Sequence, residues 1–448
     1  MSTGGLRTVD EVRVDPDRAR VYEEGWQSWS PTTWYRADET SRRPRRDWQH
    51  TMRYRAGAEL PGRGFQGSGL LVLDPGTGDP VRVYGAGFSP DHVPSIRAEL
   101  VGDRLVVTAD GGVTARTARD ATAGLADFGD RYAAQAGAVP RAAPTVWCSW
   151  YRYFLEVTEA DVVENLGAIG RHDLPVDVVQ VDDGWQSGIG DWTTPSARFA
   201  SLPRLAGTIR AAGRRAGIWV APFLAGSGSD LAREHPDWLV GDAGVNWGQS
   251  LHGVDLTHPG ARRYLGDAFR ALREAGFDYF KLDFLYGGTA PGPRHDPTVT
   301  PVAAYRSGLE LVRDAVGPDA YLVGCGAPLL PSVGLVDAMR VSPDTFHVDA
   351  QDGSRGLRGE MATTARAWQH GRLWVNDPDC VVMRASYALR ERWAHVVERY
   401  GGLRSCSDRI AELDAWGLET TRTLLATAPP PTPFPHTVPA PPPLEHRP

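Results

Sequence analysis

The 448-residue sequence lacks the features that mark membrane, secreted and disulfide-rich proteins. No apolar run approaches the roughly 18 residues that a membrane-spanning helix needs. The N-terminal residues contain no apolar segment of the kind found in a secretory signal peptide. There are only four cysteines, Cys148, Cys325, Cys380 and Cys406, and none of them has a CxxC spacing. We therefore expect reduced thiols in a cytoplasmic protein that has no membrane partner.

The sequence also lacks an excess of positive charge. Its 48 lysines and arginines are outnumbered by 55 aspartates and glutamates, which gives a formal net charge of −7. Without a basic field the protein has little means of recruiting a phosphate backbone, so we expect no nucleic-acid partner. The 12 histidines form no HExxH motif and no carboxylate–histidine pair at ligand spacing. We accordingly predict no metal site and no cofactor.

The composition is that of a globular protein with a large core, because 42% of the residues are hydrophobic and 23% are charged. This balance and the chain length predict two domains. The 15 tryptophans are many for this length. Flat aromatic rings pack against the apolar faces of sugars, so a carbohydrate site is one explanation. Ordinary core packing is the other, and we expect it for most of these residues.

Residues 1–140 predict a β-rich N-terminal domain. Residues 99–107 predict a hairpin that turns at Gly102-Asp103, and residues 117–137 predict an alanine-rich helix leading into the second domain. At the other end of the chain, residues 413–448 predict one more helix and then a tail, Pro429–Pro448, half of which is proline. We expect this tail to be disordered or polyproline-like, because such a composition cannot form a packed core.

Residues 141–412 alternate between strand and helix patterns. Eight apolar runs are each followed by a helical pattern, and they lie at residues 146–151, 177–181, 217–223, 277–282, 320–325, 338–342, 372–377 and 403–408. Eight such units over about 270 residues are typical of a (β/α)8 TIM barrel. A doubly wound open sheet is the competing fold. It rarely reaches eight units, and no Gly-rich phosphate motif follows the first run.

The central stretch of this pattern is Gly276–Gly288, which reads GFDYFKLDFLYGG. Lys281 and Asp283 are two residues apart, so on a strand their side chains project to the same face. Such a pair is either a structural ion pair at the strand end or part of a site. The other strands also end in polar groups, and active sites of TIM barrels lie where the strands end. The set comprises Asp182, Asp183, Trp219, Lys281, Asp283, Cys325, Arg340, Asp344, Asp377, Asp379 and Asp408.

Two carboxylates from different strands suit glycoside hydrolysis, in which one is the nucleophile or base and the other the acid. The charge of Lys281 would lower the pKa of Asp283 and keep it ionised for attack. Asp344 lies in a loop beyond its strand, where it could reach a leaving-group oxygen. The charge of the first carboxylate would raise the pKa of Asp344 and preserve its proton. The spacing alone leaves open whether the reaction retains or inverts the anomeric configuration.

Several motifs carry a resemblance that runs in order from about residue 20 to about residue 410. They are GWQSWSP at 25–31, WCSWYRYF at 147–154, VDDGW at 181–185, GIWVAPF at 217–223, FKLDFL at 280–285, GCGAPLLPSVGLVDAMRVSPDT at 324–345 and NDPDC at 376–380. With these motifs the chain resembles the bacterial, melibiase-type α-galactosidases of glycoside hydrolase family 36. The long match at 324–345 is the most specific of them.

The resemblance implies a retaining double displacement, in which Asp283 is the nucleophile and Asp344 the acid/base. It further implies that Asp182 and Asp183 hold the 4- and 6-hydroxyls of galactose. The remaining implied sugar-binding residues are Lys281 and Arg340 near the nucleophile, Cys325 lining the pocket, Trp219 as a wall, Trp29 from the N-terminal domain, and Tyr153. We expect Trp26 to pack rather than to touch sugar, and Asp377 and Asp379 to orient loops.

The implied activity is hydrolysis of terminal α-galactosides, so the expected partner is a small-molecule substrate. An α-N-acetylgalactosaminidase or a galactosyl transferase of the raffinose-synthase kind is the alternative on the same scaffold. A non-catalytic sugar-binding protein is a third reading, which the presence of both Asp283 and Asp344 disfavours. The natural leaving group and the oligomeric state stay open.

Overall fold

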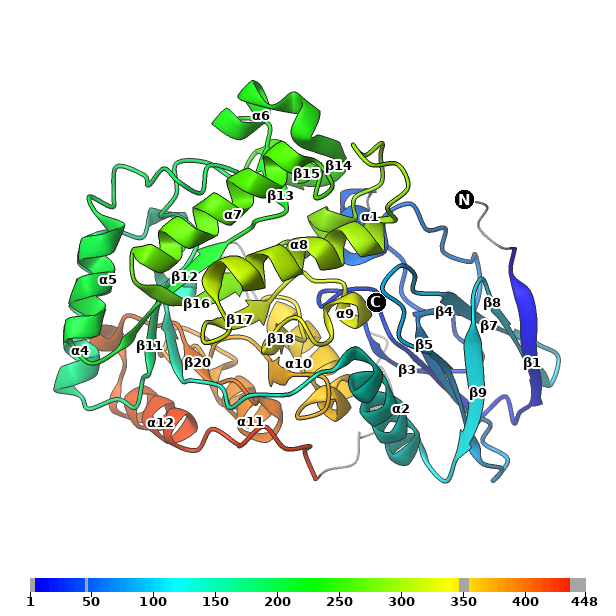
Figure 1. The fold of residues 1–448 in the computed structure, drawn as a ribbon. Coiled ribbons are helices and arrows are strands. Elements are labelled where there is room, and N and C mark those ends of the chain that lie inside the picture. Colours follow the sequence, from blue (N-terminus) through cyan, green and yellow to red (C-terminus); the bar gives the residue numbers. More distant parts are fainter. Residues whose placement is uncertain (1–4, 45–46, 346–353, 436–448) are drawn as a thin grey trace.

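The computed structural model describes residues 5–44, 47–345 and 354–435, and it contains a parallel barrel beside an N-terminal β-sandwich (Figure 1). The barrel strands are hydrogen-bonded in the order β19-β18-β17-β16-β12-β11-β10-β20. Their bounds are β10 (Val146–Cys148), β11 (Val178–Val181), β12 (Arg215–Val220), β16 (Phe277–Leu282), β17 (Tyr321–Gly324), β18 (Ala338–Arg340), β19 (Val375–Asp377) and β20 (Ser405–Cys406). All eight coincide with predicted strands, which confirms the predicted TIM barrel.

Each barrel strand is followed by a helix, as the alternation predicts. The helices are α4 (Glu159–Arg171), α5 (Leu202–Ala211), α7 (Pro259–Glu274), α8 (Pro301–Val316), α9 (Leu329–Ser332), α10 (Ser354–Ala365), α11 (Arg390–Tyr400) and α12 (Ala415–Ala426). Helix α4 begins at Glu159 because Thr158 and Asp161 form a capping box, in which each side chain accepts a hydrogen bond from the backbone N–H of the other residue. The barrel closes beyond β19, where Val381 forms a parallel bridge with Cys406 of β20.

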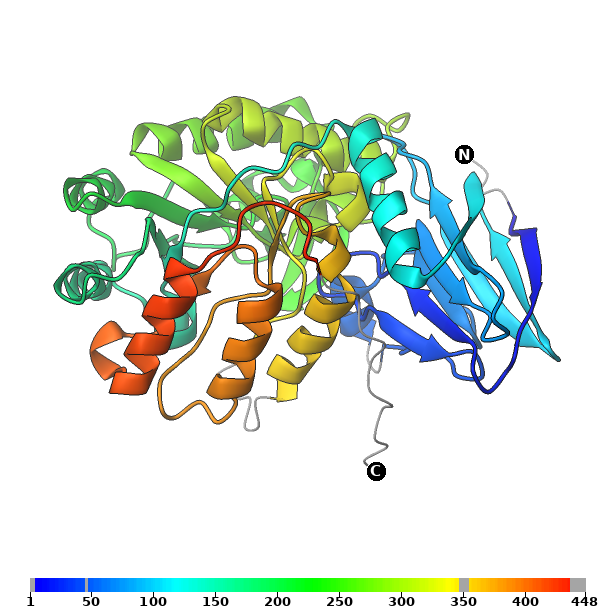
Figure 2. The same ribbon diagram turned by 90° about the horizontal axis from the view of Figure 1, so that it is seen from below.

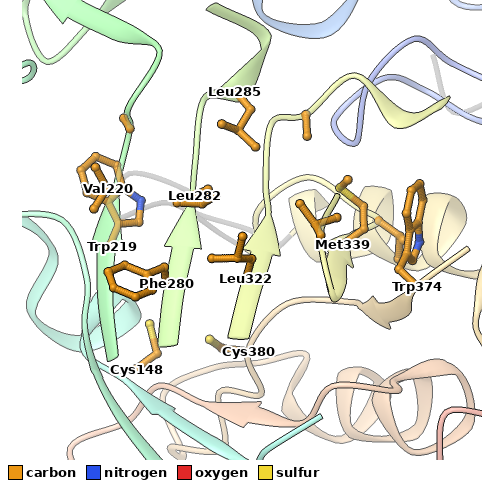
Figure 3. Close-up of a cluster of buried hydrophobic side chains, with 14 of the residues drawn as sticks. Cys148, Trp219, Val220, Phe280, Leu282, Leu285, Leu322, Met339, Trp374 and Cys380 are labelled. Carbon is orange, nitrogen blue, oxygen red and sulfur yellow. The ribbon is translucent and has the colours of Figure 1, made fainter. Parts of the chain in front are cut away.

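Strand alternation divides the barrel side chains into two sets. On β16, Phe280 and Leu282 belong to the large hydrophobic cluster, and Figure 3 shows them beside Leu322 of the neighbouring strand β17, with Met339 of β18 beyond it. Tyr279 belongs to a separate cluster to which six of the strands contribute, namely Val146, Val178, Tyr279, Tyr321, Val323, Ala338, Val375 and Leu403. Lys281 alternates with Leu282 and therefore follows Tyr279 on the interior face, toward the end where the strands finish.

The N-terminal region consists of two antiparallel sheets and helix α2 (Ala121–Ala136). One sheet has the order β1-β8-β7-β4 and the other β3-β2-β5-β6-β9. The strands are β1 (Arg7–Arg13), β2 (Arg20–Glu23), β3 (Thr33–Arg36), β4 (Phe65–Ser68), β5 (Leu70–Asp74), β6 (Val81–Ala86), β7 (Ser95–Val101), β8 (Arg104–Ala109) and β9 (Val113–Ala118). The predicted hairpin is confirmed as β7–β8, with Gly102 at φ 62° in its turn. Figure 2 shows α2 between these sheets and the barrel.

An insertion after β12 is a structure that the sequence reasoning did not foresee. It contains β13 (Leu224–Gly226), α6 (Asp230–Glu234), β14 (Leu239–Asn246) and β15 (Gln249–Val254), and its three strands form an antiparallel sheet of their own. Strands β14 and β15 turn at Trp247-Gly248. Helix α1 (Asp47–Arg53) of the N-terminal region contacts β14. The insertion and the N-terminal region therefore meet above one side of the barrel.

The predicted tail is only partly described by the structure. Phe434 stacks on His370 with ring centroids 4.0 Å apart, and His370 Nε2 lies 3.2 Å from the carbonyl oxygen of Pro430. Residues 430 and 434 therefore contact the barrel through His370, and the disordered or polyproline-like tail stays a prediction. Residues 436–448 lie outside the described part of the chain.

Two further predictions concern the cysteines and membrane-spanning helices. All four cysteines are buried and unpaired. Helices long and apolar enough to cross a membrane do not occur among the described residues.

A buried ion pair joins the loop that carries GWQSWSP to the barrel. Arg366 donates to Glu24 at 2.9 Å, and their side chains are 0% and 1% exposed. Arg366 also donates to the carbonyl oxygens of Gln27, Ser28 and Val341. This one guanidinium thus fixes the loop that presents Trp29.

We expect Arg366→Met to lower the free energy of unfolding by about 3–5 kcal/mol, because it leaves the carboxylate of Glu24 buried and unpaired. Thermal and urea unfolding measure this loss. Arg372→Met is the matched control, since its partner Asp130 is 63% exposed and such a pair contributes less than about 1 kcal/mol. Equal losses in the two variants would contradict the assignment.

Candidate active site

A cavity of about 610 Å³ opens at the carboxyl ends of the barrel strands. Its walls come from the barrel, from the N-terminal region and from the insertion. It is lined by Trp29, Met52, Arg53, Trp150, Phe154, Leu155, Asp182, Asp183, Trp219, Val245, Asn246, Trp247, Lys281, Asp283, Phe284, Pro343 and Asp344. Seven of the ten predicted site residues are among them. Both predicted catalytic carboxylates, Asp283 and Asp344, therefore face one cavity.

Asp283 directly follows β16 and is held through both carboxylate oxygens. The indole N–H of Trp219 donates to Oδ2 at 2.9 Å, and the backbone N–H of Phe284 donates to Oδ1 at 2.8 Å. Burial raises the pKa of Asp283, and the nearby charge of Lys281 opposes this rise without cancelling it. The charge of Lys281 thus lowers the pKa of Asp283 as predicted, but the loss of solvent has the larger and opposite effect.

Lys281 forms its ion pair with the carboxylate of Asp182. Its Nζ donates to Oδ2 of Asp182 at 3.0 Å, and Gln180 Nε2 donates to the same oxygen at 2.6 Å. Burial works against the ammonium charge, but the charges of Asp182 and Asp283 outweigh it and raise the pKa of Lys281 well above its usual value. Lys281 consequently stays charged, between two carboxylates on the cavity floor.

Asp183 accepts a hydrogen bond from a residue of the insertion, Trp247. The indole N–H of Trp247 donates to its Oδ2 at 2.8 Å, and Gln186 Nε2 donates to its Oδ1 at 2.6 Å. Burial raises the pKa of Asp183 to about 7, although both hydrogen bonds oppose the rise. The tip of the β14–β15 hairpin thus takes part in the site by fixing a carboxylate of the barrel.

Six of the residues that line the cavity are aromatic. Trp29 packs edge-on against Phe284 with ring centroids 4.9 Å apart, and Trp247 lies 4.7 Å from the same ring. Phe154, Trp247 and Phe284 have φ angles of 48°, 51° and 50°. Bulky side chains rarely adopt this left-handed conformation, and strained backbone is concentrated at functional sites. All three strained aromatic residues line the same cavity.

Asp344 lies in the loop after β18 and is 25% exposed, more than any other acidic side chain on this cavity. Arg340 Nη2 donates to Asp344 Oδ1 at 2.9 Å. Arg340 and Cys325 are not among the residues that line the cavity, and their contact with sugar stays a prediction. They lie behind it, because Arg340 Nη1 donates to Cys325 Sγ at 3.9 Å and the thiol is hydrogen-bonded to Asp283.

Tyr153 is also absent from the cavity lining. Its hydroxyl accepts a hydrogen bond from Asn165 Nδ2 of α4 at 2.7 Å, so the structure directs this side chain toward a barrel helix. The contact of Tyr153 with sugar stays a prediction. The WYRY segment instead turns at the end of β10 as a short helix, which sends Trp150 and Phe154 to the cavity.

The remaining strand-end residues support their neighbours. Trp26 is buried in the core, as expected. Asp379 and Asp377 accept from backbone N–H groups of their own loop, and Asp408 accepts from Met383 N and Arg384 Nη1. Within the described residues no group of three His, Cys, Asp or Glu side chains is arranged to hold a metal ion.

Sequence reasoning did not assign the other ten cavity residues, namely Met52, Arg53, Trp150, Phe154, Leu155, Val245, Asn246, Trp247, Phe284 and Pro343. The sequence does contain a pattern that could have predicted the position of Trp247. Asn246-Trp247-Gly248-Gln249 lies between two apolar segments, and a glycine at such a position is typical of a hairpin turn. Met52 and Arg53 had no such signal, because only the folded chain brings α1 to the barrel.

Comparison with known proteins agrees with this site. The sequence model of the Melibiase family matches residues 127–312. The α-galactosidase of Escherichia coli is 32% identical over 121 residues, which make up 25% of this chain and 17% of that protein. The chain therefore spans only a small part of the length of this curated relative.

The solved structures cover much more of the chain. TtGalA, an α-galactosidase from Thermus thermophilus solved with p-nitrophenyl α-D-galactopyranoside, superposes with a TM-score of 0.77 at 27% identity, over 95% of this chain and 90% of that one. The family 36 α-galactosidase AgaA from Geobacillus stearothermophilus shares the fold, with a TM-score of 0.62 at 16% identity over 93% of this chain and 62% of that one. The chain is therefore similar to the Melibiase family over residues 127–312, and it shares its fold with the α-galactosidases TtGalA and AgaA.

Proposed function

We propose that the protein is a retaining, exo-acting α-galactosidase that removes terminal α-linked galactose from oligosaccharides. One observation carries the proposal: Asp283 and Asp344 face the same aromatic-rimmed cavity, one at its buried floor and the other at its more exposed side. Glycoside hydrolysis requires two such carboxylates at the scissile bond. The match to TtGalA, which was solved with an α-galactoside, supports the choice of sugar.

In this mechanism Asp283 is the nucleophile. One of its oxygens forms a bond to the anomeric carbon while the bond from that carbon to the leaving-group oxygen breaks, and Asp344 gives its proton to that oxygen. Asp344 then removes a proton from water, which attacks the anomeric carbon and releases Asp283. The hydrogen bonds from Trp219 and Phe284 hold the attacking carboxylate in one orientation, which lowers the entropic cost of reaction.

The floor of the cavity suits a sugar rich in hydroxyls. Asp182 and Asp183 offer acceptor oxygens, Lys281 offers a donor, and Trp219 offers an apolar ring. Asp344 has the solvent access that proton transfer to a departing alcohol needs. Val245, Asn246 and Pro343 also line the cavity and are more exposed than Asp182, Asp183 and Asp283, so we propose that they meet the leaving group.

The test is hydrolysis by the wild-type protein of p-nitrophenyl α-galactoside and p-nitrophenyl α-N-acetylgalactosaminide in parallel. We expect release of p-nitrophenol from the galactoside and at least tenfold lower kcat/KM for the N-acetylated substrate. The reverse preference would make the protein an α-N-acetylgalactosaminidase. Transfer of galactose to sucrose without net hydrolysis would make it a transferase. Binding of galactose without turnover of either substrate would leave a sugar-binding protein.

Trp247→Phe should lower kcat/KM for the α-galactoside by roughly tenfold or more, mainly through KM. The variant keeps a ring on the rim but removes the hydrogen bond to Asp183, and a hydrogen bond to a charged group contributes about 1.5–3 kcal/mol. Trp238→Phe is the matched control, because Trp238 belongs to the same insertion but stacks on His235 away from the cavity. Equal effects in the two variants would contradict a role for the indole N–H.

A further inference from the structure

One guanidinium is shared by two carboxylates at the site. Arg340 Nη2 donates to Asp344 Oδ1 at 2.9 Å and to Asp379 Oδ2 at 2.7 Å. The side chains of Arg340 and Asp379 are only 2% and 3% exposed. Solvent therefore screens their interaction weakly. Asp379 does not line the cavity, so it acts on bound sugar only through its neighbours.

Asp379 is fixed in place by an unusual number of donors. The backbone N–H and the hydroxyl of Thr345 donate to its Oδ2 at 2.7 and 2.8 Å, and the hydroxyl of Tyr151 donates to the same oxygen. Together with Arg340, four donors converge on one oxygen, which is the environment of an ionised carboxylate. Asp379 has a φ of 95°, a conformation that non-glycine residues rarely adopt. Because Thr345 follows Asp344 in the chain, this network also anchors the acid/base.

The shared contact of Arg340 with Asp379 and Asp344 matters because Asp344 is the proposed general acid. A general acid must hold a proton when the substrate binds, whereas a carboxylate beside a lone guanidinium gives up its proton readily. Among the described residues, the titratable groups that interact with Asp344 include Arg340 from β18, Tyr151 after β10 and Asp283 after β16, and Asp379 after β19 shares Arg340 with it. Burial, followed by the charges of Asp344 and Asp379, raises the pKa of Tyr151 well above its usual value, so the phenol stays neutral.

We propose that Asp379 is a positioning residue that neutralises Arg340 and anchors Thr345, so that Asp344 can carry the proton it delivers to the leaving group. The inference rests on the proposed function, because it assigns Asp379 a part in the same acid/base step. Without Asp379, Arg340 would present an uncompensated positive charge to Asp344. The arginine would then hold the general acid in its ionised form.

The test is the pH profile of kcat/KM for Asp379→Asn with melibiose and with p-nitrophenyl α-galactoside. The basic limb of the profile should move to lower pH by about one unit, because an uncompensated positive charge lowers the pKa of a neighbouring carboxyl. Above the limb, hydrolysis of melibiose should fall about tenfold. p-Nitrophenyl α-galactoside should lose less, because its phenolate leaves with little protonation.

Two variants separate charge from structure. Asp379→Glu keeps the charge and should leave the basic limb at the wild-type pH. Thr345→Val removes only the hydroxyl donor and should leave it there too. An unmoved limb in Asp379→Asn, with equal losses on both substrates and a lowered Tm, would overturn the proposal. Wild-type activity on the α-galactoside is measured first, so a failure of the proposed function is seen separately.

A second test needs no activity. Carbon-13 NMR titration of labelled aspartates, with Asp344→Asn to assign the signal, measures the proton affinity of Asp344 directly. We expect Asp344 to lose its proton at higher pH in the wild type than in Asp379→Asn, because the carboxylate of Asp379 offsets the charge of Arg340. The same titration of Asp344 in both proteins would overturn the proposal.

Discussion

Asp283→Ala should lose α-galactoside hydrolysis by at least about 10⁴-fold, because removing a nucleophile from a covalent mechanism eliminates its first step. The site favours a large effect. Both oxygens of Asp283 are oriented by hydrogen bonds, from the indole N–H of Trp219 and from the backbone N–H of Phe284. Initial rates with p-nitrophenyl α-galactoside measure the loss in kcat.

Azide makes this experiment specific for the mechanism. The space left by the missing carboxylate admits a small anion, which would attack the face that Asp283 occupied and yield β-galactosyl azide. Asp278→Ala is the matched control on the same strand, since Asp278 pairs with Arg215 at the opposite end of β16 and should be dispensable for turnover. Full activity of Asp283→Ala, or an azide product of α configuration, would contradict the assignment of Asp283 as nucleophile.

Asp344→Ala should separate substrates by the acidity of their leaving groups. General acid catalysis contributes about 10²–10⁴-fold, so hydrolysis of melibiose should fall by that amount. The release of p-nitrophenol, which needs little protonation, should fall much less in the first step. The galactosyl-enzyme should then accumulate, because the base that activates water is also missing, and a burst of p-nitrophenol should precede slow turnover.

The outcome with azide should be the opposite of that for Asp283→Ala. In Asp344→Ala the nucleophile is intact, so azide would attack the galactosyl-enzyme and give α-galactosyl azide with faster turnover. Product configuration by proton NMR distinguishes the two variants. Equal losses on melibiose and p-nitrophenyl α-galactoside, without a burst, would contradict the assignment of Asp344 as acid/base.

The electrostatics of the site shows why residue spacing is a poor guide to a pKa. Lys281 and Asp283 are two residues apart and project to one face, which predicts an attraction that keeps Asp283 ionised. In the folded protein Lys281 pairs instead with Asp182 from β11, and burial raises the pKa of Asp283. Spacing along one strand shows which side chains share a face. It does not show which carboxylate a charged side chain pairs with, or how far that side chain is buried, because both depend on residues of other strands.

Arg340 and Cys325 show a related limit. Both lie at strand ends, and a strand end in a barrel is close to the cavity. Arg340 nevertheless turns toward Asp379 and Asp344, and Cys325 lies under Asp283. Whether a side chain at a strand end reaches the ligand or supports one that does depends on its rotamer. That rotamer is set by partners from other strands.

The sequence by itself determined the barrel, the eight strands and the strand ends that carry Asp182, Asp183, Asp283 and Asp344. It could do so because strand and helix periodicity is local, and because parallel strands place all their carboxyl ends on one rim. Only the tertiary structure decided that Trp247, Met52 and Arg53 complete the cavity, and that Asp379 shares Arg340 with Asp344. These contacts join segments up to hundreds of residues apart, and their geometry follows from packing that no local pattern records.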